Sequence, residues 1–172
     1  MYRSGTFSPL GFGHGGSRFS DPRDPPQFGV VYVGSTVEVC FVEAILRDKR
    51  NGVLGQLPIP LAELNAYKCA KIAIANTVTV IDLVGPNLLL NGVPTDVVGA
   101  SDQSLARAWS VAFHEHPARL GGVQYESRLI GHRNLAFYDR ALSSLRVDED
   151  RPLLSWAHEM AHVIRTYQIA II

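Results

Sequence analysis

The sequence predicts a single α+β domain in which a mixed sheet of short strands is flanked by helices. The chain has 172 residues, which is a usual size for one domain. Apolar residues make up 47% of it and charged residues 19%, so a core can form without disulfides or metal. Short strand-like segments alternate irregularly with helical patterns, unlike the regular strand–helix rhythm of a parallel α/β fold.

Charge and composition argue against several functional classes. The 16 basic and 16 acidic residues cancel, whereas sequence-independent binding of nucleic acid depends on a basic surface. No apolar run approaches the roughly 20 residues that span a bilayer, and residues 1–5 lack the apolar core of a signal peptide. Two cysteines, Cys40 and Cys69, make no disulfide framework. We therefore expect a cytoplasmic protein with no direct nucleic-acid or membrane contact.

The first segment, residues 5–27, is rich in glycine and proline and is expected to form a long irregular loop. Loops of this length are usually functional or disordered, and Arg18 and Phe19 in its middle favour function. The stretch 11–16 matches the dinucleotide fingerprint G-x-G-x-x-G. That fingerprint requires a strand before it and a helix after it, whereas a Ser-Asp-Pro segment at 20–22 follows here. We interpret the match as a flexible loop.

Residues 28–34 are expected to form a short buried strand, followed by a helix from Ser35 to about Arg47. Ser35 and Glu38 have the spacing of a capping box, with Ser35 as the N-cap. The helix is apolar on nearly every side, which is typical of a buried helix, and Glu43 interrupts it. A buried carboxylate is costly unless it is paired or functional. Both an ion pair with Arg47 and a functional role fit this position.

The rest of the chain continues the mixture of helices and short strands. The β-branched run 77–81 supports one of these strands. The expected elements are a helix over 61–67, a strand over 72–83, a helix over 101–116, strand candidates at 123–128 and 134–138, a helix over 153–167 and a final strand over 168–172.

The last of these helices carries His158-Glu159-Met160-Ala161-His162, a match to the zinc motif H-E-x-x-H. Two imidazoles one turn apart can bind zinc, with Glu159 as the general base of a metalloprotease. A third ligand is needed, and the ten residues after His162 offer no good one, which leaves His114 or His116 upstream. The alternative interpretation is an exposed, polar helix face.

A second group of residues is sparser but chemically coherent. Arg18 lies in the glycine-rich loop, where backbone can approach a ligand closely, and Tyr32 lies near the end of the apolar strand. Ser127 and Arg128 follow a Gly-Gly turn. Together with Glu43, these side chains offer the charged and hydrogen-bonding groups of a polar ligand site.

These residues and their order resemble the RES-domain family, which is named for its Arg, Glu and Ser. The resemblance covers nearly the whole chain, so residues 1–172 are expected to form a single RES domain. The matching stretches are Tyr2-Arg3, Gly16-Ser17-Arg18-Phe19, Val31-Tyr32-Val33, Glu38 through Glu43, Gly121 through Arg128, Asn134-Leu135-Ala136-Phe137 and Leu154 to Ile172. The family loop commonly reads Gly-Gly-Arg-Trp-Asn, whereas Ser17 precedes Arg18 here and Phe19-Ser20 follow it.

The resemblance implies a fold similar to that of ADP-ribosyltransferases and a toxin of a bacterial toxin–antitoxin pair. Family members deplete NAD+ by hydrolysis or phosphorolysis, or transfer its ADP-ribose to a protein acceptor. NAD+ is therefore the expected substrate, and no metal is expected. The implied partner is an Xre-like helix-turn-helix antitoxin that blocks the active site. A non-catalytic partner of a DNA-binding regulator is the alternative to an enzyme.

The resemblance also implies roles for single residues. Glu43 would stabilise the positive charge that builds at the anomeric carbon as the nicotinamide–ribose bond breaks. Arg18 suits the pyrophosphate, because its planar guanidinium offers paired donors. The implied catalytic residues are Glu43, Arg18, Tyr32 on the nicotinamide and Ser127 on the ribose or amide; Arg3, Gly16, Arg18, Tyr32 and Ser127 would bind the NAD+.

Overall fold

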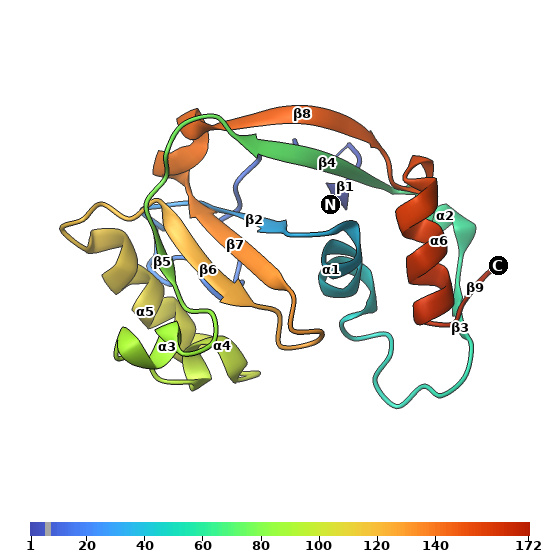
Figure 1. Ribbon diagram of the computed structural model, residues 1–172, viewed down its shortest axis with the longest axis horizontal. Helices are drawn as coiled ribbons and strands as arrows, with labels where there is room; N and C mark the ends of the chain where they lie inside the picture. Colours follow the sequence, from blue (N-terminus) through green and yellow to red (C-terminus); the bar gives the residue numbers. More distant parts are fainter. Residues whose placement is uncertain (6–7) are drawn as a thin grey trace.

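The computed structural model describes residues 1–5 and 8–172 and contains two main sheets and a small third one (Figure 1). The first sheet is antiparallel in the order β1-β4-β8, with β1 at Tyr2–Arg3, β4 at Tyr67–Ile74 and β8 at Leu145–Pro152. The second has the order β2-β7-β6-β5, with β2 at Val30–Gly34, β7 at Arg133–Tyr138, β6 at Gly122–Glu126 and β5 at Val80–Asp82. In this sheet β5 is parallel to β6 and the other pairs are antiparallel, so it is mixed as predicted. The third sheet pairs β3 (Leu57–Ile59) in parallel with β9 (Ile169–Ile171).

Short helices flank the sheets, and α3, α4 and α5 lie at the opposite end of the molecule from α2 and α6 (Figure 1). The α-helices are α1 (Val37–Phe41), α2 (Leu61–Asn65), α3 (Asn87–Leu90), α4 (Asp96–Gly99), α5 (Ser104–Glu115) and α6 (Ala157–Thr166). A π-helical turn η1 (Val42–Leu46) continues α1, and the 3-10 turns are η2 (Asp139–Ser144) and η3 (Leu153–Ser155). The predicted α+β class is confirmed. Within residues 1–5 and 8–172, every helix is too short or too polar to cross a membrane.

Three apolar clusters hold these elements together. The first joins the mixed sheet to α4 and α5 and includes Phe19, Phe28, Val97, Phe113 and Tyr138. The second joins α1 and η1 to α6 and the third sheet and includes Phe41, Leu46, Ile59, Leu64 and Val163. The third lies between the two main sheets and includes Val31, Phe137 and Leu145. Strand β2 contributes to the first cluster and leads directly into α1, so the α1–η1 segment lies where two cores meet.

The helix after β2 begins later than predicted. Thr36, in extended backbone, is the N-cap, and its hydroxyl oxygen accepts the N–H three residues later at 3.1 Å. Ser35 donates its N–H to the carbonyl of Arg133 at 2.9 Å and so extends the strand pairing. Glu38 accepts a hydrogen bond from the hydroxyl of Tyr167 at 2.9 Å. The predicted capping box is therefore wrong, because a neighbouring strand and a distant tyrosine satisfy these groups.

Several other boundaries differ from the prediction. The strand expected over 72–83 is two strands, β4 and β5, and the N–H of Ala75 between them bonds to the carbonyl of Ser144 at 2.7 Å. Because β4 already begins at Tyr67, the helix predicted over 61–67 ends at residue 65. The helix predicted over 153–167 divides at Trp156 into η3 and α6. Strand β8 and helices α3 and α4 were not predicted.

The glycine- and proline-rich segment forms an irregular loop over its described residues, and residues 6–7 of the predicted loop lie outside them. Gly13 forms an antiparallel bridge to Val30, with N–O distances of 3.1 and 3.2 Å. Turns and bends follow the stretch 11–16, and the interpretation that it is not a dinucleotide fingerprint fits this geometry.

Asp21 fastens this loop from inside the protein. Its side chain is fully buried, accepts hydrogen bonds from the Arg23 guanidinium at 2.8–3.1 Å and accepts the N–H of Gln27 at 2.6 Å. Burial opposes ionisation of this carboxyl, but the hydrogen bonds outweigh it and hold the pKa of Asp21 at about 2. The buried carboxylate therefore fixes residues 21–27, the part of the loop that follows Arg18.

Candidate active site

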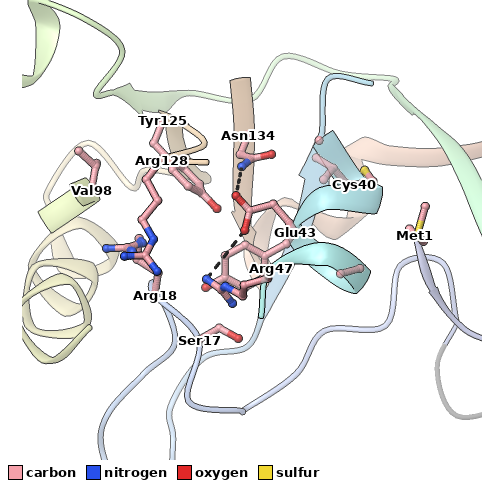
Figure 2. A pocket seen from close by; sticks show the side chains of 14 residues that line it. Met1, Ser17, Arg18, Cys40, Glu43, Arg47, Val98, Tyr125, Arg128 and Asn134 are labelled. Carbon is pink, nitrogen blue, oxygen red and sulfur yellow. Dashed lines mark hydrogen bonds and ion pairs between the residues drawn. The ribbon is translucent and has the colours of Figure 1, made fainter. Parts of the chain in front are cut away.

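A cavity of about 210 Å³ lies where the glycine-rich loop, β2, η1 and the β6–β7 connection meet (Figure 2). Three of the predicted site residues line it, namely Arg18, Tyr32 and Glu43. The full lining is Met1, Ser17, Arg18, Tyr32, Val33, Gly34, Cys40, Glu43, Ala44, Arg47, Val98, Tyr125, Arg128 and Asn134. Ser127, the fourth predicted catalytic residue, reaches the cavity through its hydrogen bond to Glu43.

Glu43 projects from the π-helical turn η1 and is held at both carboxylate oxygens. Its Oε1 accepts a hydrogen bond from the Ser127 hydroxyl at 2.7 Å and lies 3.5 Å from the amide nitrogen of Asn134. Its Oε2 lies 3.8 Å from the Arg47 guanidinium, a contact that Figure 2 marks with a dashed line. The ion pair with Arg47, which was one of the two interpretations of this position, is present, and the same carboxylate faces the cavity.

Ser127 is buried, and the turn after β6 fixes its position. Its N–H donates to the carbonyl of His132 at 2.7 Å, and its own carbonyl accepts the N–H of Gly131 at 2.8 Å. Its hydroxyl oxygen also accepts the N–H of Leu129 at 3.2 Å while the hydroxyl donates to Glu43. A hydroxyl with both roles filled holds the carboxylate in one orientation.

Arg18 is 6% exposed and connects the glycine-rich loop to α4. Its guanidinium donates to the carbonyl of Val97 at 3.1 Å and to the carbonyl of Ala100 at 2.8 Å. These bonds use two of its five N–H donors. Burial lowers the pKa of Arg18, although a guanidinium remains charged in proteins. The side chain is thus both a structural crosslink and a wall of the cavity.

Tyr32 has its phenol oxygen occupied by the same loop. The oxygen accepts the N–H of Phe19 at 2.8 Å, and burial raises the pKa of Tyr32 to about 12. Burial likewise raises the pKa of Tyr125, whose ring packs edge-on to Phe19 with centroids 5.0 Å apart. Both phenols are therefore neutral at ordinary pH, and their rings bound the cavity beside Glu43.

The charged side chains that line the cavity, among the residues that the structure describes, are three arginines and one carboxylate. Arg47 and Arg128 join Arg18 in this lining, and Glu43 supplies the carboxylate. Figure 2 shows the side chains of Arg18 and Arg128 converging on one side of Glu43. This excess of two positive charges suits an anionic ligand.

Asn134 was not predicted as a site residue, and Arg47 and Arg128 were given no individual role in binding or catalysis. Asn134 had no signal apart from its place in a matching stretch, because it comes next to Glu43 only when β7 pairs with β2. The signal for Arg47 was its position four residues after Glu43, which was interpreted only as a possible ion pair.

Two residues implied for NAD+ binding lie outside the lining of the cavity. Arg3 on β1 donates from Nε to the Tyr67 hydroxyl at 3.3 Å, and its guanidinium lies 5.2 Å from the centroid of that ring. Gly16 precedes the lining residue Ser17, and its carbonyl accepts a hydrogen bond from Arg107 at 2.9 Å. The roles implied for them stay predictions.

The H-E-x-x-H match lies on α6, in the helical setting expected of it. His162 is exposed and lies 3.7 Å from Glu38. The candidate third ligand His114 lies on α5, where its ring stacks on that of Phe28 with centroids 4.1 Å apart. Helix α5 lies at the opposite end of the molecule from α6 (Figure 1). His116 accepts the N–H of the residue two positions later at 3.2 Å. Within the described ranges, no three His, Cys, Asp or Glu side chains are grouped to hold a metal ion.

The fold and the site define an α+β domain that holds one fixed carboxylate in an arginine-lined cavity, an arrangement that suits an anionic ligand. The chain belongs to the RES domain family, whose model matches residues 2–157. The family resemblance drawn from the sequence is thereby confirmed.

Two similar proteins were found by comparison. The chain is 34% identical over 127 residues to the probable toxin y4kH of Sinorhizobium fredii, an alignment that covers 74% of this chain and all of that protein. Its fold is similar to a chain in the crystal structure of the M. tuberculosis MbcT–MbcA toxin–antitoxin complex, with a TM-score of 0.57 and 19% identity. That match covers 85% of this chain and 77% of the other.

Proposed function

We propose that this protein is the toxin of a toxin–antitoxin pair and that it consumes NAD+ by cleaving the bond between nicotinamide and ribose. One observation carries the proposal, which is the Glu43 carboxylate held by Ser127 inside a cavity of excess positive charge. Membership of the RES domain family and the relative named a probable toxin support it.

The proposed reaction uses Glu43 as an electrostatic catalyst. Positive charge builds at the anomeric carbon as the bond to nicotinamide breaks, and a carboxylate already in place stabilises that charge without having to reorganise. The 2.7 Å bond from Ser127 supplies this fixed position. The electron pair of the broken bond leaves with nicotinamide, and water, phosphate or a protein side chain takes the ADP-ribose.

The other residues of the cavity would bind the rest of NAD+. Arginines pair well with phosphate oxygens, so Arg18 is assigned to the pyrophosphate. The ring of Tyr32 lines the cavity beside Glu43 and would stack on the nicotinamide, because its neutral phenol is already occupied by the loop. Ser127, whose hydroxyl is already bonded to Glu43 and to the N–H of Leu129, would act on the ribose or the amide through the carboxylate that it holds.

The proposed partner is an Xre-like helix-turn-helix antitoxin that covers this cavity in the cytoplasm. The complex of MbcT with its antitoxin MbcA is the related arrangement that supports a protein partner. The net charge of zero is consistent with DNA contact made by such a partner rather than by this chain. A purely non-catalytic role beside a DNA-binding regulator is the competing proposal, and toxicity on expression that Glu43→Gln relieves would speak against it.

The test is proton NMR of NAD+ incubated with the purified chain, with and without phosphate. Wild type is expected to release free nicotinamide, and Glu43→Gln is expected to release none while keeping its fold. Glu149→Gln is the matched control, because the Glu149 side chain is 41% exposed on β8 and pairs with Arg151 outside the cavity lining, so its substitution should leave the rate unchanged. Full activity of Glu43→Gln would sink the assignment, and dependence on phosphate would separate phosphorolysis from hydrolysis.

A further inference from the structure

We propose that Arg47 is an exchangeable counterion of Glu43, which moves to a phosphate group of the ligand and so frees the carboxylate when an anion binds. This inference rests on the proposed function and deepens it, since it adds a residue that couples the phosphates of the substrate to the carboxylate. No covalent bond forms or breaks in the step.

The guanidinium of Arg47 makes a single long ion-pair contact among the described residues. Its guanidinium lies 3.8 Å from Glu43 Oε2, which is longer than the 2.7–2.9 Å or so of a charge-assisted hydrogen bond. Its side chain is 38% exposed, and within the described ranges Glu43 is the one partner found for it. Arg18 is the contrast, because it is buried and bonded to two carbonyls. Arg47 is therefore the arginine that can change partner at low cost.

The backbone of Arg47 is well anchored, so the exchange moves only the side chain. Its N–H donates to the carbonyl of Val42 at 2.8 Å, which closes the π-helical turn η1. Glu43 keeps its position in the exchange, because Ser127 holds Oε1 at 2.7 Å independently of Arg47. Departure of the guanidinium would leave Oε2 exposed to the cavity with its charge no longer neutralised.

The charge of the cavity favours this exchange when a diphosphate enters. The three arginines exceed the one carboxylate by two positive charges, which matches the two negative charges of a pyrophosphate. A phosphate of the ligand competes with Glu43 for the Arg47 guanidinium. When the guanidinium pairs with the phosphate, the Glu43 carboxylate becomes available to the ribose. Substrate binding would in this way remove the counterion from the Glu43 carboxylate, so that its negative charge can act on the reacting ribose.

A double-mutant cycle with ADP as the probe tests the coupling by isothermal titration calorimetry. ADP carries the diphosphate but neither the nicotinamide ribose nor the bond that is cleaved. Glu43→Gln leaves Arg47 without its competitor, so it is expected to bind ADP about fivefold more tightly than wild type. In an Arg47→Gln background the same change is expected to bring a gain of less than about twofold.

Two further variants separate this coupling from a general charge effect. In an Arg128→Gln background the gain from Glu43→Gln should persist, because Arg128 does not pair with the carboxylate. Arg146→Gln is the surface control, since its side chain is 69% exposed and should leave ADP affinity within about twofold of wild type. Thermal melting verifies each fold, and Arg47→Met, which keeps the length of the aliphatic stem, replaces Arg47→Gln if the latter is unstable.

The outcomes for the coupling and for the NAD+ reaction are distinct. The exchange is overturned if Glu43→Gln raises ADP affinity equally with and without Arg47, or does not raise it. It is also overturned if neither wild type nor Glu43→Gln binds ADP. Nicotinamide release by wild type together with such a result would leave the proposed reaction standing. The expected coupling without any cleavage of NAD+ would overturn hydrolysis and phosphorolysis, leave transfer to a protein acceptor as the reaction, and keep Arg47 as the anion-responsive partner of Glu43.

Discussion

Replacing Ser127 by alanine removes the shortest of the three contacts to the Glu43 carboxylate, the hydrogen bond of 2.7 Å to Oε1. A hydrogen bond to a charged group contributes about 1.5–3 kcal/mol, and about 1.4 kcal/mol corresponds to tenfold in rate. We therefore expect kcat for nicotinamide release to fall by about 10- to 150-fold, with little change in KM for NAD+. Asn134 lies 3.5 Å from the same oxygen, so Asn134→Ala is expected to lower kcat by less than about tenfold.

The same substitution also affects stability, which the assay has to separate from catalysis. The Ser127 oxygen accepts the N–H of Leu129 at 3.2 Å, and because Leu129 is exposed, the loss of this bond costs about 0.5–1.5 kcal/mol. At this size each kcal/mol lowers Tm by about 2–4 °C, so the variant stays folded at 25 °C if its starting stability is ordinary. Ser155→Ala is the matched control, because that hydroxyl bonds to a carbonyl at 2.6 Å on the surface. A folded Ser127→Ala protein with kcat within about threefold of wild type would refute the reasoning.

Two further predictions concern stability. Tyr32→Phe removes the acceptor of the Phe19 N–H and should lower the free energy of unfolding by about 1–3 kcal/mol in a urea titration, and an unchanged midpoint would contradict this. The folded pKa of Asp21, about 2, lies below its ordinary value of 3.8, so its ionised form stabilises the fold above pH 4 and this contribution is lost as the pH falls toward 2. Urea titrations from pH 5 to pH 2.5 should show the free energy of unfolding of wild type falling by part of a total of about 2 kcal/mol, a loss that Asp21→Asn should not show. The same dependence of that free energy on pH in both proteins would refute the assignment.

The sequence was most informative where one residue broke a local pattern. Glu43 is a carboxylate in a helix that is otherwise nearly all apolar, and the structure places it in the cavity. Arg18, in a segment that cannot form a regular element, also lines that cavity. For Glu43 the local pattern marked an unusual position, because burying a charge is costly whatever element lies opposite, whereas the roles expected of Glu43 and Arg18 came from the family resemblance.

Features set by distant partners could not be predicted in this way. Strand β8 contains four consecutive charged residues, 148–151, instead of an alternating apolar pattern, and it is defined by its pairing with β4, about 75 positions earlier in the chain. The capping groups were misassigned because Tyr167 bonds to Glu38 and the first residue of β7 bonds to Ser35. Asn134 reaches Glu43 only across the β2–β7 pairing. Tertiary partners decided each of these, as local propensity is a weak guide there.

The two carbonyl bonds of Arg18 affect how mutations at that position are to be interpreted. Substituting this residue detaches the loop from α4 and deletes a cation from the cavity in one change. Lysine would keep the charge but has a single ammonium where the guanidinium reaches two carbonyls with separate nitrogens. A genetic screen for inactive variants would therefore recover Arg18 for two reasons at once. Substitutions at Val97 or Ala100 would not separate these reasons, because the acceptors there are backbone carbonyls that every residue keeps.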